Sequence, residues 1–180
     1  MKILVCSDIH GSAYYCRCML KAFEEEKADR MLLLGDILYH GPRNDLPREY
    51  APKEVIAMLN EYRDRIYAVR GNCEAEVDQM VLQFPVMADY CILPVGEHVV
   101  YATHGHVYNE NNLPPMSQGD ALLHGHTHVW KAEEREGWKL LNPGSTSIPK
   151  EGNPPTYAIL EDGVFRVKTF EGKVLGSITL

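Results

Sequence analysis

The sequence has no long hydrophobic segment, no excess of basic residues, and no repeated or low-complexity stretch. No apolar run approaches the roughly 18 residues that a membrane-spanning helix needs, so we expect no membrane insertion. The net charge of -7 argues against general nucleic-acid binding, because that function uses basic side chains to neutralise phosphates. The first residues are too few for the core of a signal peptide and run directly into Asp8 and His10.

The five cysteines are an odd number and lack the paired spacing of a zinc ribbon. Cys16 and Cys18 would lie two residues apart on a helix, where side chains diverge, so we expect neither a metal site nor a disulfide from them. Reduced thiols predict a cytoplasmic protein. With 180 residues, of which 45% are hydrophobic, the chain has the size and composition of one globular domain, residues 1–180.

Strand-like and helix-like segments alternate through the first half. Three apolar runs, at 2–6, 31–34 and 66–69, predict buried strands. Apolar side chains recur at helical spacing after Ser12, a capping residue, and after Pro52, which favours a helix start. This alternation is typical of a parallel sheet with helical crossovers, in which ligands bind beyond the carboxyl ends of the strands.

The second half predicts mostly strands. Two segments flank Gly96 and predict a hairpin, at 91–95 and 98–103. Further strands are expected at 121–124, 129–133, 138–141, 156–160, 164–170 and 173–179. The proline-containing segments 39–52 and 109–119 predict irregular loops that shape a pocket. We therefore expect an α/β half followed by a largely β half.

Metal-binding side chains recur directly after these strands. They comprise two carboxylates, one amide and four imidazoles: Asp8, His10, Asp36, Asn72, His104, His126 and His128. Such a mixed nitrogen and oxygen set suits manganese, iron, zinc, cobalt or nickel better than calcium. The set is too large for one tetrahedral ion and fits two ions that share a bridging carboxylate, for which Asp36 is the best candidate.

The charge of such a site predicts its substrate. Two divalent ions would outweigh the two carboxylates, so the site would stay positive and favour an anion. Two ions about 3.5–4 Å apart can clamp the attacking and leaving oxygens of a phosphoryl displacement, and a metal lowers the pKa of bound water to ~7. These properties predict metal-dependent hydrolysis of phosphoesters.

Five segments of the chain also resemble, in order, the five motifs of the calcineurin-like metallophosphoesterase superfamily. They are Asp8-Ile9-His10, Gly35-Asp36, Gly71-Asn72-Cys73-Glu74, Thr103-His104-Gly105-His106 and Gly125-His126-Thr127-His128, and Asn142-Pro143-Gly144-Ser145 fits as well. The resemblance extends over essentially the whole chain. The small size, the Gly-Asn-Cys variant and the segment 40–44 are most similar to the bacterial YfcE-type phosphodiesterases.

This resemblance implies a fold, a cofactor and a substrate class. The fold would be α/β, a four-layer αββα sandwich of two mixed β-sheets flanked by helices. The cofactor would be two divalent ions, usually Mn2+, with Zn2+, Fe2+, Ni2+ or Co2+ as alternatives, and a bridging hydroxide would attack phosphorus in line. The substrate would be a small-molecule phosphodiester, and the protein a homodimer or homotetramer. One ion would take Asp8, His10, Asp36 and His128, and the other Asp36, Asn72, His104 and His126.

Cys73 departs from the pattern of many family members, which have a histidine after Gly-Asn that protonates or stabilises the leaving oxygen. A thiol, with an ordinary pKa of ~8.5, could donate a proton, but it is a weak hydrogen-bond donor without the imidazolium charge. We therefore expect higher activity on aryl phosphodiesters, whose leaving groups need little protonation, than on alkyl or nucleotide esters.

The sequence leaves several other roles open. His106, a candidate catalytic residue with Cys73, would either contact substrate or orient His104. Arg43 and His40 are candidate substrate-binding residues; an arginine fork suits a phosphate, but either side chain would also suit a solvated loop. Two other functions compete. A scaffold of this fold with a degraded site should have lost ligands, and all of them are present here. A peptidase of the common zinc class would carry a helical His-Glu-X-X-His, which the sequence lacks.

Overall fold

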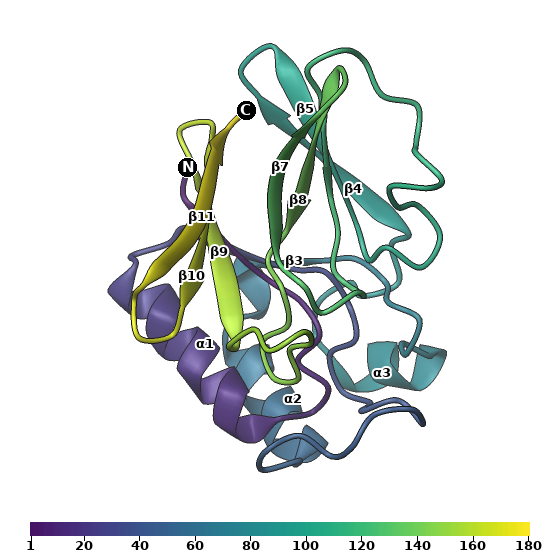
Figure 1. The fold of residues 1–180 in the computed structure, drawn as a ribbon. Coiled ribbons are helices and arrows are strands. Elements are labelled where there is room, and N and C mark those ends of the chain that lie inside the picture. Colours follow the sequence, from purple (N-terminus) through teal and green to yellow (C-terminus); the bar gives the residue numbers. More distant parts are fainter.

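The apolar runs of the first half form three neighbouring strands of a six-stranded sheet in the computed structural model, which describes all residues 1–180 (Figure 1). The strand order is β11-β10-β9-β1-β2-β3. The strands β1, β2 and β3 run parallel, as the sequence predicts, and β9 pairs antiparallel with β1. The bounds are β1 Ile3–Cys6, β2 Arg30–Leu33, β3 Ile66–Ala68, β9 Thr156–Glu161, β10 Val164–Thr169 and β11 Val174–Thr179.

The second sheet has five strands in the order β4-β5-β6-β8-β7. The expected hairpin is confirmed as β4 and β5, and the strands β5, β6 and β8 run parallel to one another. The bounds are β4 Tyr90–Val95, β5 His98–Thr103, β6 Ala121–Leu123, β7 Lys131–Arg135 and β8 Trp138–Asn142. The two mixed sheets flanked by helices that the sequence predicts are therefore confirmed.

The helices are few, and all of them come from residues before 82: α1 Ala13–Glu25, α2 Pro52–Glu61 and α3 Glu76–Val81, with one 3-10 turn at Arg63–Arg65. The predicted starts of the first two helices are confirmed, because the Ser12 hydroxyl accepts the Tyr15 N–H and Pro52 is the first residue of α2. The sequence does not predict α3, which is only six residues long; its apolar residues Val77, Met80 and Val81 recur at helical spacing, but none of them is buried.

Strand β1 has apolar residues on both faces, and each face packs into a different core. Leu4 and Cys6 join the core between the first sheet and the helices, whereas Ile3 and Val5 join the core between the two sheets. All four side chains are almost fully buried, so the run is continuously apolar instead of alternating. This double burial fixes the position of the loop that follows β1, which carries Asp8 and His10.

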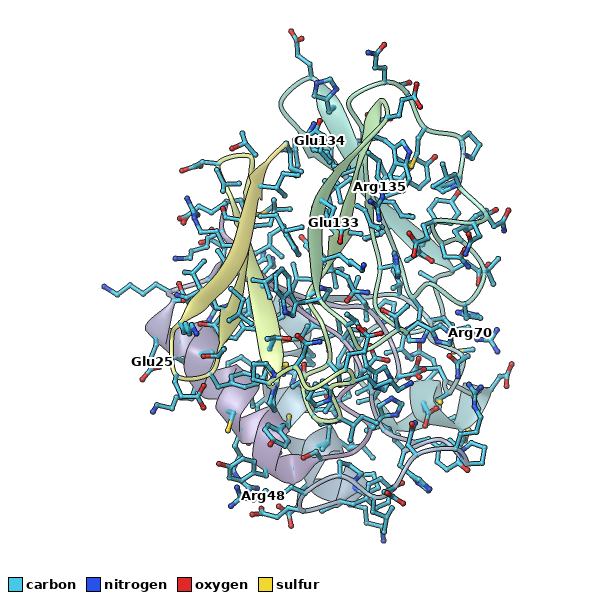
Figure 2. All side chains as sticks on the ribbon, viewed as in Figure 1. Glu25, Arg48, Arg70, Glu133, Glu134 and Arg135 are labelled. Carbon is cyan, nitrogen blue, oxygen red and sulfur yellow. The ribbon has the colours of Figure 1, made fainter.

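One edge of the second sheet carries charged side chains. Figure 2 shows Glu133, Glu134 and Arg135 on β7, the edge strand of that sheet. The Arg135 guanidinium lies 2.5 Å from the Glu133 carboxylate, and Lys131 lies 3.2 Å from the same residue. Charged side chains on an exposed edge disfavour pairing with strands of other molecules. None of the helices has the length and apolar character needed to cross a membrane.

The Ser12→Ala substitution should destabilise the protein by about 1–2 kcal/mol, because it removes the α1 cap. It also removes the hydrogen bond that the Ser12 hydroxyl donates to the Arg48 carbonyl, at 2.6 Å. Urea unfolding followed by circular dichroism measures the loss. Ser177→Ala is the matched control, since Ser177 is exposed on β11. Equal stabilities of the two variants would contradict the capping role.

Candidate metal centre

The predicted ligands converge where the strands of both sheets end, and most of them have unusual backbone geometry. Asp8, His10, Asp36, His126 and His128 have positive φ angles of 57°, 49°, 53°, 65° and 62°. Left-handed backbone is uncommon for residues other than glycine, and it concentrates at active sites and ligand clamps. Here it turns each side chain away from its strand and toward a common centre.

Backbone hydrogen bonds join the loops that follow β1 and β2. The Asp8 N–H donates to the Gly35 carbonyl at 3.2 Å, and the His10 N–H donates to the Asp36 carbonyl at 2.9 Å. This pairing brings three predicted ligands together. The His10 Nε2 atom lies 3.7 Å from the Asp8 Oδ1 atom and 3.7 Å from the Asp36 Oδ2 atom.

Three imidazole rings are oriented by hydrogen bonds to backbone carbonyls. The His10 Nδ1 atom lies 2.7 Å from the Tyr39 oxygen, the His104 Nδ1 atom 2.6 Å from the Leu34 oxygen, and the His128 Nδ1 atom 2.7 Å from the Ile148 oxygen. Because a carbonyl only accepts, each Nδ1 carries the proton, and each Nε2 faces the centre. Metal-binding histidines are typically held in this way.

The centre contains two groups of donor atoms. In the first group, the His128 Nε2 atom lies 3.2 Å from the Asp8 Oδ1 atom and 3.4 Å from the His10 Nε2 atom. In the second group, the Asn72 Oδ1 atom and the His126 Nδ1 atom each lie 3.1 Å from the His104 Nε2 atom. Asp36 lies between the groups, with Oδ2 near His10 and Oδ1 3.5 Å from the His104 Nε2 atom.

Several features of these donors fit bound divalent cations. Asp8 is fully buried, and its Oδ1 atom has no hydrogen-bond partner in the protein, an arrangement that is costly without a compensating charge. The His10 and His128 Nε2 atoms face each other although neither carries a proton in the neutral rings. Burial and the neighbouring His104 lower the pKa of His126 to about 4, so that ring is neutral at pH 7. Burial opposes ionisation of Asp8, but when the His10 and His128 rings carry a proton on Nε2, toward the carboxylate, they outweigh burial and hold the pKa of Asp8 well below its usual value.

A cavity of about 500 Å³ opens onto this centre. Ligand residues Asp36, Asn72, His126 and His128 form part of its wall, together with Cys73, Arg43 and Lys150. Only one of its 11 lining residues is hydrophobic. The cleft therefore combines metal-binding atoms with two basic side chains, an arrangement that suits an anion such as a phosphate group.

A family model described as the calcineurin-like phosphoesterase superfamily domain matches residues 1–162. The chain belongs to the calcineurin-like phosphoesterase superfamily. Membership implies divalent metal ions, in agreement with the donor set described above. Phosphodiesterase YfcE of Escherichia coli strain K12 is 46% identical over 167 residues, which cover 93% of this chain and 91% of YfcE.

Solved structures extend this similarity to the fold of this phosphoesterase. A structure of YfcE, described as a phosphoesterase from E. coli, superposes with a TM-score of 0.97 and 42% identity over 99% of both chains. Vps29 of Entamoeba histolytica, solved in complex with Zn2+, covers 99% of both chains at 19% identity with a TM-score of 0.60, a likeness of fold alone.

Of the other predicted site residues, some line the cleft and some do not. Arg43 lines the cleft, whereas His40 does not; its ring packs edge to face against Tyr39 and Tyr50. His106 is exposed, and its ring centroid lies 5.4 Å from that of His104. His124 is buried and donates no ligand atom to the groups described above.

The sequence alone assigns no role to Glu74, which holds the backbone of the turns beside the metal centre. Its buried carboxylate accepts three backbone N–H groups, those of Asp36 at 2.8 Å, Ile37 at 2.7 Å and Gly71 at 2.5 Å. The turn at Gly71 approaches so closely that a Cβ atom there would collide with the Asp36 Oδ1 atom. The only signal for Glu74 in the sequence is its place in the Gly-Asn-Cys-Glu motif.

Two further supports come from late in the chain. The hydroxyls of Ser145 and Ser147 donate to the Asp8 carbonyl at 2.9 Å and 3.1 Å. The Lys150 N–H donates to the His128 carbonyl at 3.1 Å, and this bond places the Lys150 side chain at the cleft. No local pattern marks Lys150, because its position depends on the fold that brings residue 150 beside His128.

Glu74→Gln should weaken metal binding by about 10–100-fold, because one carboxylate oxygen is replaced by an amide group that cannot accept the N–H groups. The backbone N–H groups left without an acceptor should also lower the free energy of unfolding by about 1–3 kcal/mol. Calorimetric titration with Mn2+ and urea unfolding measure the two effects. Glu76→Gln, an exposed change two residues further on, should leave both unchanged. A Glu74→Gln protein with the metal affinity of the wild type would exclude the supporting role.

Proposed function

We propose that this phosphoesterase is a metal-dependent phosphodiesterase that uses two divalent ions, Mn2+ before others. The observation that carries the proposal is the position of Asp36, whose two carboxylate oxygens face two different groups of ligand atoms. One ion would be held by Asp8, His10, Asp36 and His128, and the other by Asp36, Asn72, His104 and His126. When bound, such ions supply a water-derived hydroxide for in-line attack on phosphorus and neutralise the phosphate charge.

The chain's own residues would bind and orient the substrate. Arg43 and Lys150, which line the cleft, would bind the phosphate oxygens that the metal ions leave free. His106 lies beside His104, and we assign it contact with the substrate or orientation of that ligand. Since His40 packs against two tyrosines and lies outside the cleft lining, we assign it an indirect effect on substrate through the position of the Arg43 loop.

The diester class follows from the similarity to YfcE, which is named a phosphodiesterase. The preference for aryl esters follows from Cys73. Burial first, and then the Asp36 carboxylate, raise the pKa of the Cys73 thiol, so it stays neutral at pH 7. A neutral thiol gives weak help to a leaving alkoxide, whereas an aryl oxide leaves with little help.

We also propose that residues 1–180 form a single cytoplasmic domain. A single domain over residues 1–180 is supported by β9, β10 and β11, which return to the sheet that β1 begins. All five cysteines are unpaired, which supports the proposed cytoplasmic location. A homodimer or homotetramer stays a prediction from the family resemblance.

Asp36→Ala should abolish the activity, because the change would disturb both metal ions. We expect a rate at least about a hundredfold lower, since even indirect supports of a metal site are worth about 10–100-fold. Chromogenic phosphodiesters and phosphomonoesters assayed with Mn2+, together with metal analysis of the purified protein, measure the effect. Asp45→Ala, an exposed change in the loop before α2, is the control. A wild-type protein that binds metal and hydrolyses no phosphoester would favour a scaffold function.

Cys73→His should broaden the substrate range toward nucleotide and other alkyl diesters. An imidazolium beside the leaving oxygen can donate a proton and contributes a positive charge, and general acid catalysis is worth about 10²–10⁴-fold. The ratio of kcat/KM for a nucleotide diester to that for an aryl diester reports the change. Cys73→Ser is the control, because it keeps a small neutral side chain. An unchanged ratio in Cys73→His would refute the assignment.

A further inference from the structure

A second cavity lies directly beside the cleft and shares Cys73 with it as a common wall. Its volume is about 450 Å³, within the range of about 300–1,000 Å³ that is typical of small-molecule sites. Eight of its 11 lining residues are hydrophobic, against one of 11 in the cleft. The two cavities therefore offer opposite chemistry on the two sides of one side chain.

The walls of this apolar cavity come from three segments. The loop after β2 contributes Tyr39 and Tyr50, the first turns of α2 contribute Ile56, and α3 contributes Val77 and Val81. Three of these side chains are unusually exposed for their type, with 43% of Tyr39, 60% of Val77 and 39% of Val81 accessible to solvent. Exposed apolar groups gathered around a hollow indicate a binding surface.

The apolar cavity begins one side chain away from the metal-binding atoms. The Cys73 Sγ atom lies within 4.8 Å of ligand atoms of His10 and Asp36. A phosphorus atom held at the centre would therefore place an ester oxygen near Cys73, and a substituent on that oxygen would extend past the thiol. The charged residues of the apolar cavity, Lys53 and Asp78, have opposite signs, so nothing there favours a charged substituent.

We propose that this cavity binds one organic group of the phosphodiester substrate, and that the group is uncharged, apolar and preferably aromatic. The inference rests on the proposed function, and it identifies the substrate class of the same site. The phosphate would stay with the metal ions, Arg43 and Lys150, while the ring would contact Tyr39, Tyr50 and Val77. Aryl preference then has a cause independent of the leaving-group chemistry at Cys73, namely the burial of apolar surface.

Two phosphonates that cannot be hydrolysed separate binding from chemistry. Calorimetric titration of the Mn2+-loaded protein with phenylphosphonate and with methylphosphonate compares the same anion with and without a ring. We expect phenylphosphonate to bind about tenfold more tightly, as burial of an aromatic side chain would allow. Equal dissociation constants would overturn the proposal, and they are the result expected if the cavity instead receives another protein.

The Val77→Asn substitution should reduce this phenyl preference about threefold to fivefold by making the wall polar without adding charge. It should leave the affinity for methylphosphonate unchanged. Val81→Asn, which alters the same wall one turn later, should act in the same direction. Met80→Asn is the matched control, since Met80 lies on the same short helix, is 82% exposed and does not line the cavity. All three variants should fold, because no residue of α3 is buried.

The outcomes separate the two levels of the proposal. A protein that hydrolyses diesters but shows no phenyl preference, or a preference that Val77→Asn and Met80→Asn alter equally, would overturn the apolar subsite alone. A protein that hydrolyses no diester with Mn2+, yet binds phenylphosphonate with a preference sensitive to Val77→Asn, would overturn the proposed function and support the subsite.

Discussion

The buried Glu74 carboxylate is the interaction on which the rest of the centre depends. It accepts backbone N–H groups from both the turn that carries Asp36 and the turn before Asn72, so one side chain fixes the position of Asp36 relative to Asn72. Burial and the Asp36 carboxylate raise the pKa of Glu74, while the three N–H donors oppose that shift. The donors and the carboxylate are therefore mutually dependent, because either one alone would be buried and unsatisfied.

The ligands themselves occupy backbone conformations that their residue types disfavour. Five left-handed ligand residues, at a cost on the order of 1 kcal/mol or more each, persist only where the surroundings over-determine them. The surroundings here are the central strands, whose two faces are buried in two separate cores, and the hydrogen bonds from the Ser145 and Ser147 hydroxyls to the Asp8 carbonyl. The fold thus holds a set of ligand atoms in place whose mutual repulsion bound cations would relieve.

The sequence predicts the parts of this arrangement that depend on local order along the chain. Ligands at strand ends meet because parallel strands end at one edge of a sheet, so the order of the residues is enough to place Asp8, His10 and Asp36 together. The sequence could not show in this way which distant segments hold the ligands and line the cleft. Lys150 reaches the cleft through a backbone bond to His128, and β9 joins β1 across more than half of the chain. Such long-range pairings depend on which apolar surfaces are still exposed after the central strands have formed. A local sequence pattern carries no information about those surfaces.

Cys73 lies between the polar cleft and the apolar cavity and lines both of them. A histidine at this position would bring a ring, with its hydration and, when protonated, its charge, to the boundary between the polar cleft and the apolar cavity. The thiol is smaller and neutral, so an apolar substituent can pass from one cavity to the other without displacing a charged or strongly hydrated group. The loss of a strong proton donor and the access to an apolar subsite are therefore consequences of one residue. Under the proposed function both would favour esters of aromatic alcohols, which leave readily and bury apolar surface, and a change at this single position should alter the two properties together.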